Sequence, residues 1–485
     1  MMMTKEQEFL KAQSLVQGLQ QMVELAIAEG RRIDEVEGEL FAGLMQVGKA
    51  LLGGFVAAQG DGDVGPTVTD DQEQTWRRLP EVNTRRYVSV FGELLISRFV
   101  YGTRAGQKIE AVPLDARLGL PASDFSYLLE NWVQQLCVKE SFQEAGASLA
   151  TLLGLRLGVR TLETMNQRLA DFADAFRDQQ PVPETEEALL VVTADGKGVP
   201  MRRPLEERVC GHQRRRKGEK AQKKQMAYVG AVYSIARFVR TASDVVEEVC
   251  RRERAADRPR PQHKRVRAEM TAVLEGEAIV TGRETLFGEL SDEVVRRRRG
   301  QTVKLVCLLD GERALWEQRA EYFPWSVGIL DLFHVLERLW QVAHAWHGEQ
   351  SPRAPEMVTD SLRMLLEGKV RQLLARLRRR LKTHPLKGSK RTTVQAAINY
   401  MRNQQEHMKY DEYLAAGYPI GSGVVEGACR HLVKDRLEET GMRWTVAGAQ
   451  AMLDTRAIYL NGDWKAFLQY RIAKEQTRLY GQMAA

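Results

Sequence analysis

The sequence predicts an α/β protein in which a mixed β-sheet core is interrupted by a helical insertion and preceded by a mostly helical region with a β-hairpin. Two observations carry this prediction. Between residues 186 and 340, short apolar runs alternate with segments of helical periodicity, which is typical of strands joined by helices. From Met357 to Tyr413 the helical periodicity continues without a strand. The composition, 44% hydrophobic and 28% charged over 485 residues, is that of a globular protein of about three domains.

Residues 1–80 are expected to form an acidic helical region. They contain 7 Lys/Arg and 13 Asp/Glu, so the rest of the chain carries a formal charge of +13 against a total of +7. Apolar residues recur at helical spacing from Leu40 to Leu51. Because Gln46 and Lys49 interrupt the apolar stretch Phe41–Ala58, we expect a packing helix there and no membrane span.

Residues 81–180 are expected to contain a β-hairpin and then a helical DNA-binding region. The segment Arg86–Tyr101 is rich in β-branched and aromatic residues, as is usual for a hairpin. A break at Leu153–Gly158 and the polar helix that follows it, Thr161–Phe172, resemble a helix-turn-helix. The break is longer than the usual turn, so an ordinary pair of helices is the alternative.

A proline- and acid-rich linker, Gln180–Glu187, marks the start of the expected core. Residues 186–340 are its first part, 341–415 a basic helical insertion, and 416–485 its end with further helices. The insertion is basic because residues 369–391 contain ten Lys/Arg and no Asp/Glu. In the first part we expect a helix over Leu332–Trp346 and four strands before it: Ala188–Thr193, Met226–Val239, Val303–Leu309 and Val327–Leu330.

Two aspartates, Asp195 and Asp310, each follow an apolar strand and precede a glycine. Functional groups in open α/β sheets gather at the carboxyl ends of strands, although an Asp-Gly pair is often only a turn. If the two strands are neighbours, both carboxylates lie at one edge of the sheet. Hard oxygen ligands in such a position suit Mg²⁺ or Mn²⁺.

A third acidic residue, Glu426, follows the tight loop that ends at Gly423. Ser422 in this loop is a suitable N-cap, so Glu426 is expected near the start of a helix. Arg430 and Lys434 follow at spacings of four and eight residues, and in an α-helix they share a face with Glu426. The alternative is an ordinary surface ion pair between residues four apart.

Together these segments resemble the DDE transposases with an RNase H-like core, and among them the ISKra-type insertion-sequence transposases. The similar blocks lie between about residues 85 and 460 and include Thr193–Met201, Leu308–Glu312, Asp331–His334, Ile420–Glu426 and Gly441–Trp444. The resemblance implies an RNase H-like mixed sheet with an all-helical insertion before the helix that carries the glutamate. It assigns Asp195, Asp310 and Glu426 as the catalytic, metal-binding triad, and Arg430 and Lys434 as contacts to transposon-end DNA.

The function that this resemblance implies is DNA transposition. Such an enzyme binds the terminal inverted repeats of an insertion sequence, cleaves the strands and transfers them to target DNA. Cleavage by water and attack by a 3′-OH require no protein nucleophile but two metal ions about 4 Å apart. We therefore expect two Mg²⁺ or Mn²⁺ ions as cofactors, and a homodimer or larger oligomer on double-stranded DNA. The alternatives are an RNase H-like nuclease without strand transfer and a domesticated DNA-binding protein without catalysis.

Basic segments are expected to contact DNA phosphates. Residues 202–224 contain ten Lys/Arg and three Asp/Glu, and Arg214, Arg215 and Arg216 are the candidates among them. A second basic run is Arg251–Arg267, and a third, Arg296–Arg299, stands just before the Asp310 strand. Any one run could be a solvated helix face, but several of them near candidate metal ligands favour phosphate contact with salt-dependent affinity.

The remaining polar residues are assigned structural roles. Asp331 is expected to cap the helix that follows it, and His334 to pack or hydrogen-bond rather than to ligate a metal.

The five cysteines form no C-x-x-C pair, and the stretch after the hairpin lacks the cysteine pairs by which relatives hold a small zinc ribbon, so no zinc is expected. Sparse cysteines and the absence of a secretory signal fit a cytoplasmic protein, which the resemblance makes bacterial and nucleoid-associated.

Overall fold

The computed structural model describes residues 4–71, 73–104, 109–202, 224–251, 257–273, 279–299, 303–439 and 441–481. The chain forms two compact units, Met1–Phe172 with Trp464–Ala485, and Ala173–Asp463. The segment 416–485, taken from the sequence as the end of the core, is thus divided between them. Arg214, Arg215 and Arg216 lie outside the described residues.

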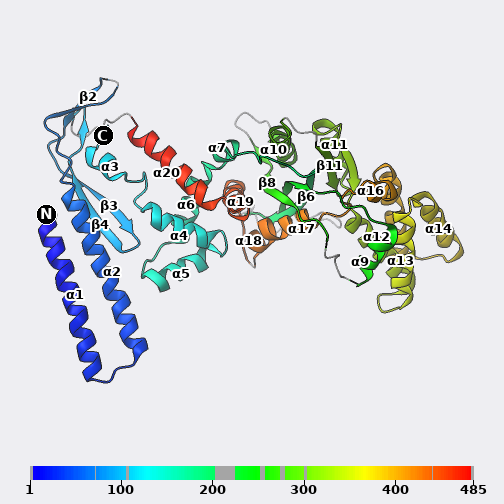
Figure 1. The fold of residues 1–485 in the computed structure, drawn as a ribbon, viewed down its shortest axis with the longest axis horizontal. Coiled ribbons are helices and arrows are strands. Elements are labelled where there is room, and N and C mark those ends of the chain that lie inside the picture. Colours follow the sequence, from blue (N-terminus) through cyan, green and yellow to red (C-terminus); the bar gives the residue numbers. More distant parts are fainter. Residues whose placement is uncertain are drawn as a thin grey trace, which may run out of the picture. The chain divides into compact units, whose positions relative to one another are not determined.

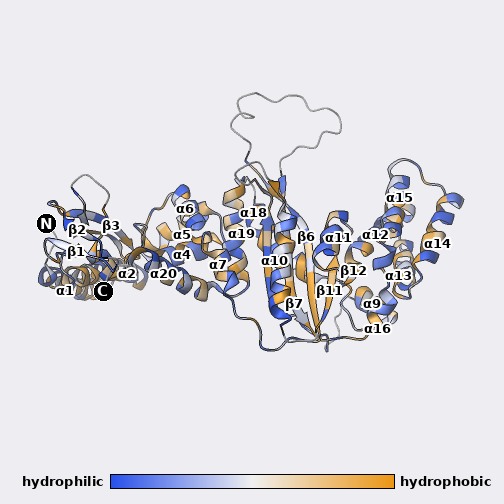
Figure 2. Cartoon of the chain, turned by 90° about the horizontal axis from the view of Figure 1, so that it is seen from above, coloured by the Kyte–Doolittle hydropathy of each residue, from blue (hydrophilic) through white to orange (hydrophobic). Residues whose placement is uncertain are grey.

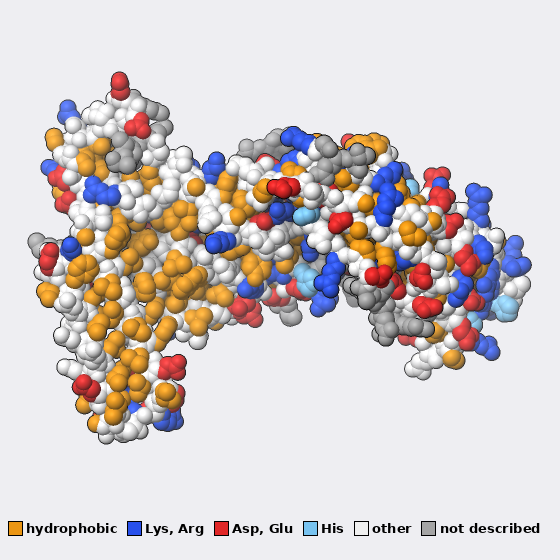
Figure 3. Space-filling view, viewed as in Figure 1, with side chains coloured by type: hydrophobic (Ala, Val, Ile, Leu, Met, Phe, Trp, Pro, Cys, Tyr) orange, Lys and Arg blue, Asp and Glu red, His pale blue; other side chains and the backbone are white. Residues whose placement is uncertain are grey.

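The first unit begins with a helical hairpin, α1 (Lys5–Ala28) and α2 (Ile33–Ala58). Small residues let the two helices approach closely, since a Cβ atom on Gly43 would lie 2.3 Å from the Leu19 side chain. The other side of α2 is apolar and exposed, and Figure 3 shows apolar side chains gathered along both helices, among them Phe41, Leu44, Leu51 and Phe55. By length and composition alone, α2 could cross a membrane, a test that buried helices of soluble proteins also pass.

The expected β-hairpin is present in this unit. β3 (Asn83–Ser89) pairs antiparallel with β4 (Gly92–Arg98) across a two-residue turn. A break after α5 separates it from α6, as predicted, because Gly154 takes a left-handed conformation (φ 66°) that ends the helix. The further elements are β1 (Thr67–Thr69), β2 (Thr75–Arg78), β5 (Tyr101–Gly102), α3 (Pro113–Leu118), α4 (Tyr127–Cys137), α5 (Phe142–Leu153), α6 (Val159–Ala170) and α20 (Trp464–Tyr480).

The C-terminal helix α20 is an integral part of the first unit. Arg471 on α20 forms an ion pair with Glu130 on α4, and a second one, at 3.3 Å, with Glu475. All three side chains are less than a tenth exposed. Gln476 donates hydrogen bonds of 2.9 Å to the Gly119 carbonyl and to the Tyr127 hydroxyl. The two ends of the chain therefore share one folded unit.

The second unit is built on a five-stranded mixed sheet in the order β12-β11-β6-β7-β8. Figure 1 labels β6, β8 and β11 of this sheet. β6, β7 and β8 are antiparallel, whereas β11 and β12 run parallel to β6. The predicted α/β class is confirmed. The strands are β6 (Leu189–Pro200), β7 (Lys224–Ile235), β8 (Gln262–Met270), β11 (Lys304–Leu309) and β12 (Val327–Leu330), with the short pair β9 (Ala272–Val273) and β10 (Ile279–Val280).

Helices cover both faces of this sheet. Alternate strand residues point to opposite faces: Leu190, Val192 and Leu305 pack with α10 (Gly282–Arg297) and α11 (Arg313–Tyr322) in one hydrophobic core. Leu189, Val191 and Val306 belong to a second core with α12 (Leu332–His347) and the insertion helices. Figure 2 shows the apolar strands between α10 on one side and α12 on the other.

The insertion is helical, as predicted, and follows α12. It consists of α13 (Arg353–Leu366), α14 (Val370–Thr383), α15 (Gly388–Asn403), the 3₁₀ helix Gln405–His407 and α16 (Tyr410–Ala415). The chain then returns to the sheet through α17 (Gly423–Ala428), the π-helical segment Cys429–Lys434, α18 (Asp435–Leu437) and α19 (Val446–Leu460). Two further helices, α7 (Ala173–Asp178) and α9 (Ala242–Arg251), complete the unit.

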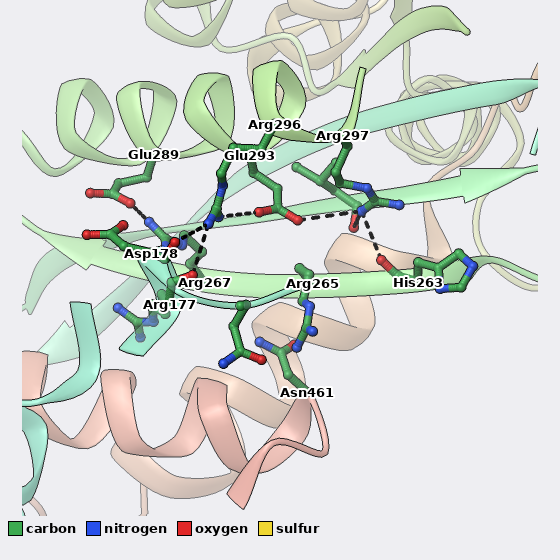
Figure 4. Close-up of polar contacts among 12 residues, drawn as sticks. Arg177, Asp178, His263, Arg265, Arg267, Glu289, Glu293, Arg296, Arg297 and Asn461 are labelled. Carbon is green, nitrogen blue, oxygen red and sulfur yellow. Dashed lines mark hydrogen bonds and ion pairs between the residues drawn. The ribbon is translucent and has the colours of Figure 1, made fainter. Parts of the chain in front are cut away.

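Buried charges tie α10 to the edge of the sheet (Figure 4). Arg297 on α10 makes a bidentate ion pair with Glu186, at 2.6 and 2.8 Å, and neither side chain has any exposed surface. Arg297 also donates a 2.9 Å hydrogen bond to the His263 carbonyl, and Arg267 on β8 pairs with Glu289. The geometry of two parallel N–H···O bonds makes the Arg297–Glu186 contact a strong one.

Candidate metal centre

Three aspartates lie in one row across the sheet. The parallel ladders pair Ala194 with Leu309, and Leu309 with Leu330. Each next residue is an aspartate, so Asp195, Asp310 and Asp331 follow at matching positions on β6, β11 and β12. By the alternation of strand side chains they share the face of Val191, Leu308 and Ile329, which is the α12 face. The parallel pairing thus sets three carboxylates side by side at one end of the sheet.

The sequence suggested that Asp195 lies at the end of its strand, but in the structure it lies within β6. β6 continues through Pro200 because its antiparallel pairing with β7 extends to Lys224. What ends at Ala194 is the parallel ladder with β11. Asp195 Oδ1 accepts a 2.7 Å hydrogen bond from Gly196 N, and the Cys429 thiol lies 3.5 Å from Oδ2.

Asp310 is positioned by α11 and by the insertion. Its Oδ1 accepts a 2.8 Å hydrogen bond from Glu312 N, and its carbonyl accepts one of 2.7 Å from the Trp316 indole. The next residue must be small, since a Cβ atom on Gly311 would lie 2.0 Å from the ring of Tyr400 on α15. The insertion therefore closes tightly over the loop that carries Asp310.

Glu426 reaches the same end of the sheet from α17. Ser422 is the N-cap of this helix, as predicted, and its hydroxyl accepts a 3.2 Å hydrogen bond from Val425 N. The loop is fastened to two strands: Ser422 N donates to Asp331 Oδ2 at 3.0 Å, and the hydroxyls of Ser422 and Thr193 lie 3.0 Å apart. These contacts hold the start of α17 over the row of aspartates.

Asp331 has two roles. It caps α12, as predicted, because its Oδ1 accepts a 2.8 Å hydrogen bond from Phe333 N. It also belongs to a group that the sequence did not predict: ligand atoms of Asp331, His334 and Glu426 all lie within 4.8 Å of one another, the one such group of three or more found among the described residues. Both oxygens of Asp331 accept a backbone N–H, Oδ1 from Phe333 and Oδ2 from Ser422, and a carboxylate oxygen that accepts one hydrogen bond keeps a second lone pair for a cation.

Burial and mutual repulsion raise the pKa values of these acids. Burial raises the pKa of Glu426 to about 8, with the Asp331 carboxylate as the next largest cause. Burial also raises the pKa of Asp331. For Asp310, burial raises the pKa first, and the negative charges of Asp195 and Asp331 add to it. The carboxylates of this cluster therefore repel one another when all of them are ionised.

The residues fit a divalent cation. Both carboxylate oxygens of Glu426 are buried, and neither makes a well-formed hydrogen bond in the described part of the chain; the backbone N–H of Glu426 and the Asp331 carboxyl lie close enough to influence the pKa of Glu426. A buried carboxylate normally accepts hydrogen bonds or faces a cation. Two carboxylates and an imidazole, from Asp331, Glu426 and His334, are ligands that Mg²⁺ or Mn²⁺ and related metals accept, with oxygen preferred by Mg²⁺. Of the predicted triad, only Glu426 belongs to the close group of three; Asp195 and Asp310 lie on its β6 and β11 side.

Arg430 and Lys434 lie on exposed helix surface beyond Glu426. The uninterrupted α-helix expected there is wrong, because Cys429–Lys434 is π-helical and its turns take an extra residue. Arg430 lies 3.7 Å from Asp435. Asp435 also pairs with His431 at 2.9 Å, and Glu438 pairs with Lys224 at 2.5 Å. In the described chain, neither of these acids takes Lys434 as its partner.

The sequence contained a signal for Asp331 that was not used. Asp331 follows the apolar strand Val327–Leu330 just as Asp310 follows Val303–Leu309. Its position at a strand end therefore indicated a ligand as well, but capping of the helix that follows was enough to explain an aspartate there. His334 lies three residues after Asp331 on the same helix, but only the approach of α17 to α12 brings Glu426 to this pair.

Comparisons with known proteins add little to this geometry. No protein-family model and no curated protein matches the chain. Among solved structures, the Drosophila P element transposase strand transfer complex is similar to it over 72% of this chain and 80% of that chain, with 9% sequence identity and a TM-score of 0.23. A score of this size does not establish a shared fold, so the function has to be argued from the residues of the site.

Proposed function

We propose that this chain is a DDE transposase with an RNase H-like core, which cleaves and joins DNA with two Mg²⁺ or Mn²⁺ ions. The observation that supports this best is Glu426, whose buried carboxylate lies beside Asp331 and His334 without a well-formed hydrogen bond in the described chain. The mixed sheet with its helical insertion before the glutamate helix is the arrangement that the sequence resemblance implies.

The proposed ligands form two adjoining sets. Asp331, His334 and Glu426 would hold one ion, and Asp195 and Asp310 a second beside it. Bound divalent ions supply activation of the attacking oxygen and stabilisation of the leaving oxygen in phosphodiester chemistry. The protein's own contribution is positioning: Ser422 N and Phe333 N fix the Asp331 carboxylate, and Glu312 N fixes that of Asp310.

The proposed substrate is double-stranded DNA, namely the terminal inverted repeats of an insertion sequence and a target. Arg430 and Lys434 are proposed as phosphate contacts beyond the metal centre. We propose further that the protein acts as a homodimer or larger oligomer on DNA, in the bacterial cytoplasm at the nucleoid. A nuclease without strand transfer would use the same carboxylates, and only the joined product separates the two activities.

The test is an end-cleavage and strand-transfer assay on DNA that carries the element's ends. Asp195→Asn, Asp310→Asn, Asp331→Asn and Glu426→Gln should each abolish Mg²⁺-dependent cleavage and leave DNA binding intact. Glu356→Gln, which changes an exposed acid of α13, is the control and should cleave normally. Near-normal cleavage by the Glu426→Gln protein would refute the proposal, and cleavage without joining by the wild type would leave a nuclease.

A further inference from the structure

A cavity of about 990 Å³ opens beside the metal centre, within the second unit. α17 contributes Gly423, Val424 and Gly427 to its wall, whereas Glu426 on the same helix is not part of that wall. Leu332 and Phe333, which follow Asp331 directly, line it from α12. The cavity is at the upper end of the volumes usual for small-molecule sites, and only a helix and a helix start separate it from the acidic cluster.

The cavity contains a buried arginine that lacks a full set of partners. The Arg240 side chain is 7% exposed, and its Nε has no hydrogen-bond partner in the part of the chain that the structure describes. The nearest acid, Glu248, lies 3.6 Å from Arg240 and 3.3 Å from Arg258. Two guanidinium groups thus share one carboxylate. Burial and the charge of Arg258 lower the pKa of Arg240, so a further anion at this point would be stabilising.

The rest of the lining suits a nucleotide. Arg260 and Lys264 add exposed positive charge at the rim. Ile235, Val245, Leu336 and Leu460 make apolar walls. Phe333 lines the cavity and is 44% exposed, although an aromatic ring of this size is usually buried. Exposed aromatic rings beside basic side chains are the combination on which single-stranded nucleic acids stack.

We propose that this cavity receives an unpaired nucleotide of the DNA strand that is being processed. Its phosphate lies at Arg240 and Arg258, and its base lies against Phe333. Unpaired nucleotides arise wherever a duplex end is opened for chemistry, and pulling a base out of the stack costs a few kcal/mol that such a pocket offsets. This inference rests on the proposed function, because the nucleotide in the cavity would belong to the DNA strand on which the proposed metal centre acts.

The glycines of α17 keep the cavity open. A Cβ atom on Gly423 or Gly427 would meet no heavy atom within 4 Å, so a larger side chain there would enter free space and not the packed protein. Gly427→Leu therefore fills the cavity without removing charge. The helical conformation at this position suits leucine better than glycine.

The experiment measures binding of a fluorescent single-stranded oligonucleotide by anisotropy in EDTA, so that metal-dependent cleavage of the oligonucleotide does not contribute to the signal. Phe333→Ala, Arg258→Gln and Gly427→Leu should each weaken binding about tenfold, as expected when one base stack or one charged phosphate contact is lost. Phe333→Trp should restore stacking. Lys304→Gln, which removes an exposed charge at the other end of β11, is the control and should bind as the wild type does.

A duplex with one mismatched 2-aminopurine near its end, and a free mononucleotide as competitor, complete the test. Fluorescence of the probe should rise on binding to the wild type and less on binding to the Phe333→Ala protein. Competition by the mononucleotide at concentrations near those of the oligonucleotide would overturn the assignment to a DNA strand in favour of a free nucleotide. Wild-type affinity in Phe333→Ala, Arg258→Gln and Gly427→Leu alike would overturn the cavity assignment altogether.

The two proposals fail separately. If the wild type cleaves DNA with Mg²⁺ while all cavity variants bind oligonucleotide normally, the cavity assignment falls and the proposed function stands. If the wild type cleaves no DNA with Mg²⁺ or Mn²⁺ while the cavity variants lose oligonucleotide binding, the proposed function falls and the cavity remains a nucleotide site.

Discussion

At the scale of single residues, the acidic cluster holds more negative charge than the described protein neutralises. The pKa of Glu426 is about 8 in the folded chain against an ordinary value of 4.5. For an acid with a raised pKa, the folded state binds the proton more tightly than the unfolded state. Its contribution to stability is then complete below about pH 4.5 and is lost as the pH rises through about 8.

We therefore predict that the metal-free protein becomes less stable between pH 5 and pH 8. Glu426→Gln should flatten this decline, because the amide cannot ionise, and should leave a smaller slope due to Asp310 and Asp331, whose pKa values shift in the same direction. Urea unfolding in EDTA at several pH values measures it. Identical pH slopes for the two proteins would contradict the electrostatic account of the cluster.

Metal ions should reverse the same effect. If Mg²⁺ or Mn²⁺ binds the ionised carboxylates of the folded state, as we propose, either ion should raise the melting temperature more at pH 8 than at pH 5. In the Glu426→Gln protein the shift should shrink strongly, while in the Glu356→Gln protein it should remain. A wild-type shift that does not depend on pH would show that the ions bind elsewhere.

Lys434 gives a second prediction at this scale. It is exposed, and the two acids most able to pair with it, Asp435 and Glu438, pair with other residues. Lys434→Ala should weaken binding to DNA of any sequence and reduce the salt slope of the affinity by about one unit, since one phosphate contact is lost. Lys304→Ala is the matched control. An unchanged slope with a lowered melting temperature would assign Lys434 a structural role.

Single residues of the site were predictable only where they follow a strand or a helix cap that the local sequence indicates. Asp195 and Asp310 follow apolar strands that periodicity identifies, and Glu426 follows a loop whose N-cap is legible in the sequence. The partnership of Glu426 with His334 depends on α17 crossing near α12. Such a crossing is a tertiary contact over more than ninety residues, and no local pattern encodes it.

At the scale of elements, β8 is a strand that the sequence analysis did not predict, because its residues are rich in positive charge. Residues 262–270 include Lys264, Arg265 and Arg267, which we interpreted as part of a basic run. They form the edge strand of the sheet, and their charges are used: Arg265 pairs with Asp463 and Arg267 with Glu289. Edge strands often carry charge because it discourages pairing with other chains, so a basic run and a strand are not exclusive.

The buried pair between α10 and the start of the core gives a prediction for this scale. Arg297→Met should destabilise the protein by about 3–5 kcal/mol, because it removes the bidentate guanidinium that neutralises the buried Glu186 carboxylate. The double variant Arg297→Met with Glu186→Leu should recover most of the loss, since two apolar side chains then replace two charges. Urea unfolding of the four proteins of this cycle measures the coupling. Equal stability of the single and double variants would contradict it.

At the scale of the whole molecule, the two ends of the chain belong to one unit, while the candidate metal centre belongs to the other. Removal of residues 464–485 should destabilise the first unit, because Glu130 loses Arg471 and remains buried. The second unit contains all the proposed metal ligands, so its Mg²⁺-dependent thermal shift should persist. Calorimetry with and without Mg²⁺ measures both effects, and Arg471→Met is the matched point variant. Loss of the Mg²⁺ shift on truncation would contradict this division.

The helical insertion also has a consequence for the order of folding. Asp331 and Glu426 are separated by 95 positions, yet Leu332 N, at the start of α12, donates a 2.8 Å hydrogen bond to the carbonyl of Ile420, which lies between the insertion and α17. Contacts between residues so distant along the chain form late, because their loop-closure entropy must be overcome first. During synthesis the nascent chain therefore lacks Glu426 beside Asp331 and His334 until α17 has emerged and docked. If the proposed activity is correct, a partly made chain could not cut the DNA near it, because its acidic cluster is completed only after the whole insertion has been made.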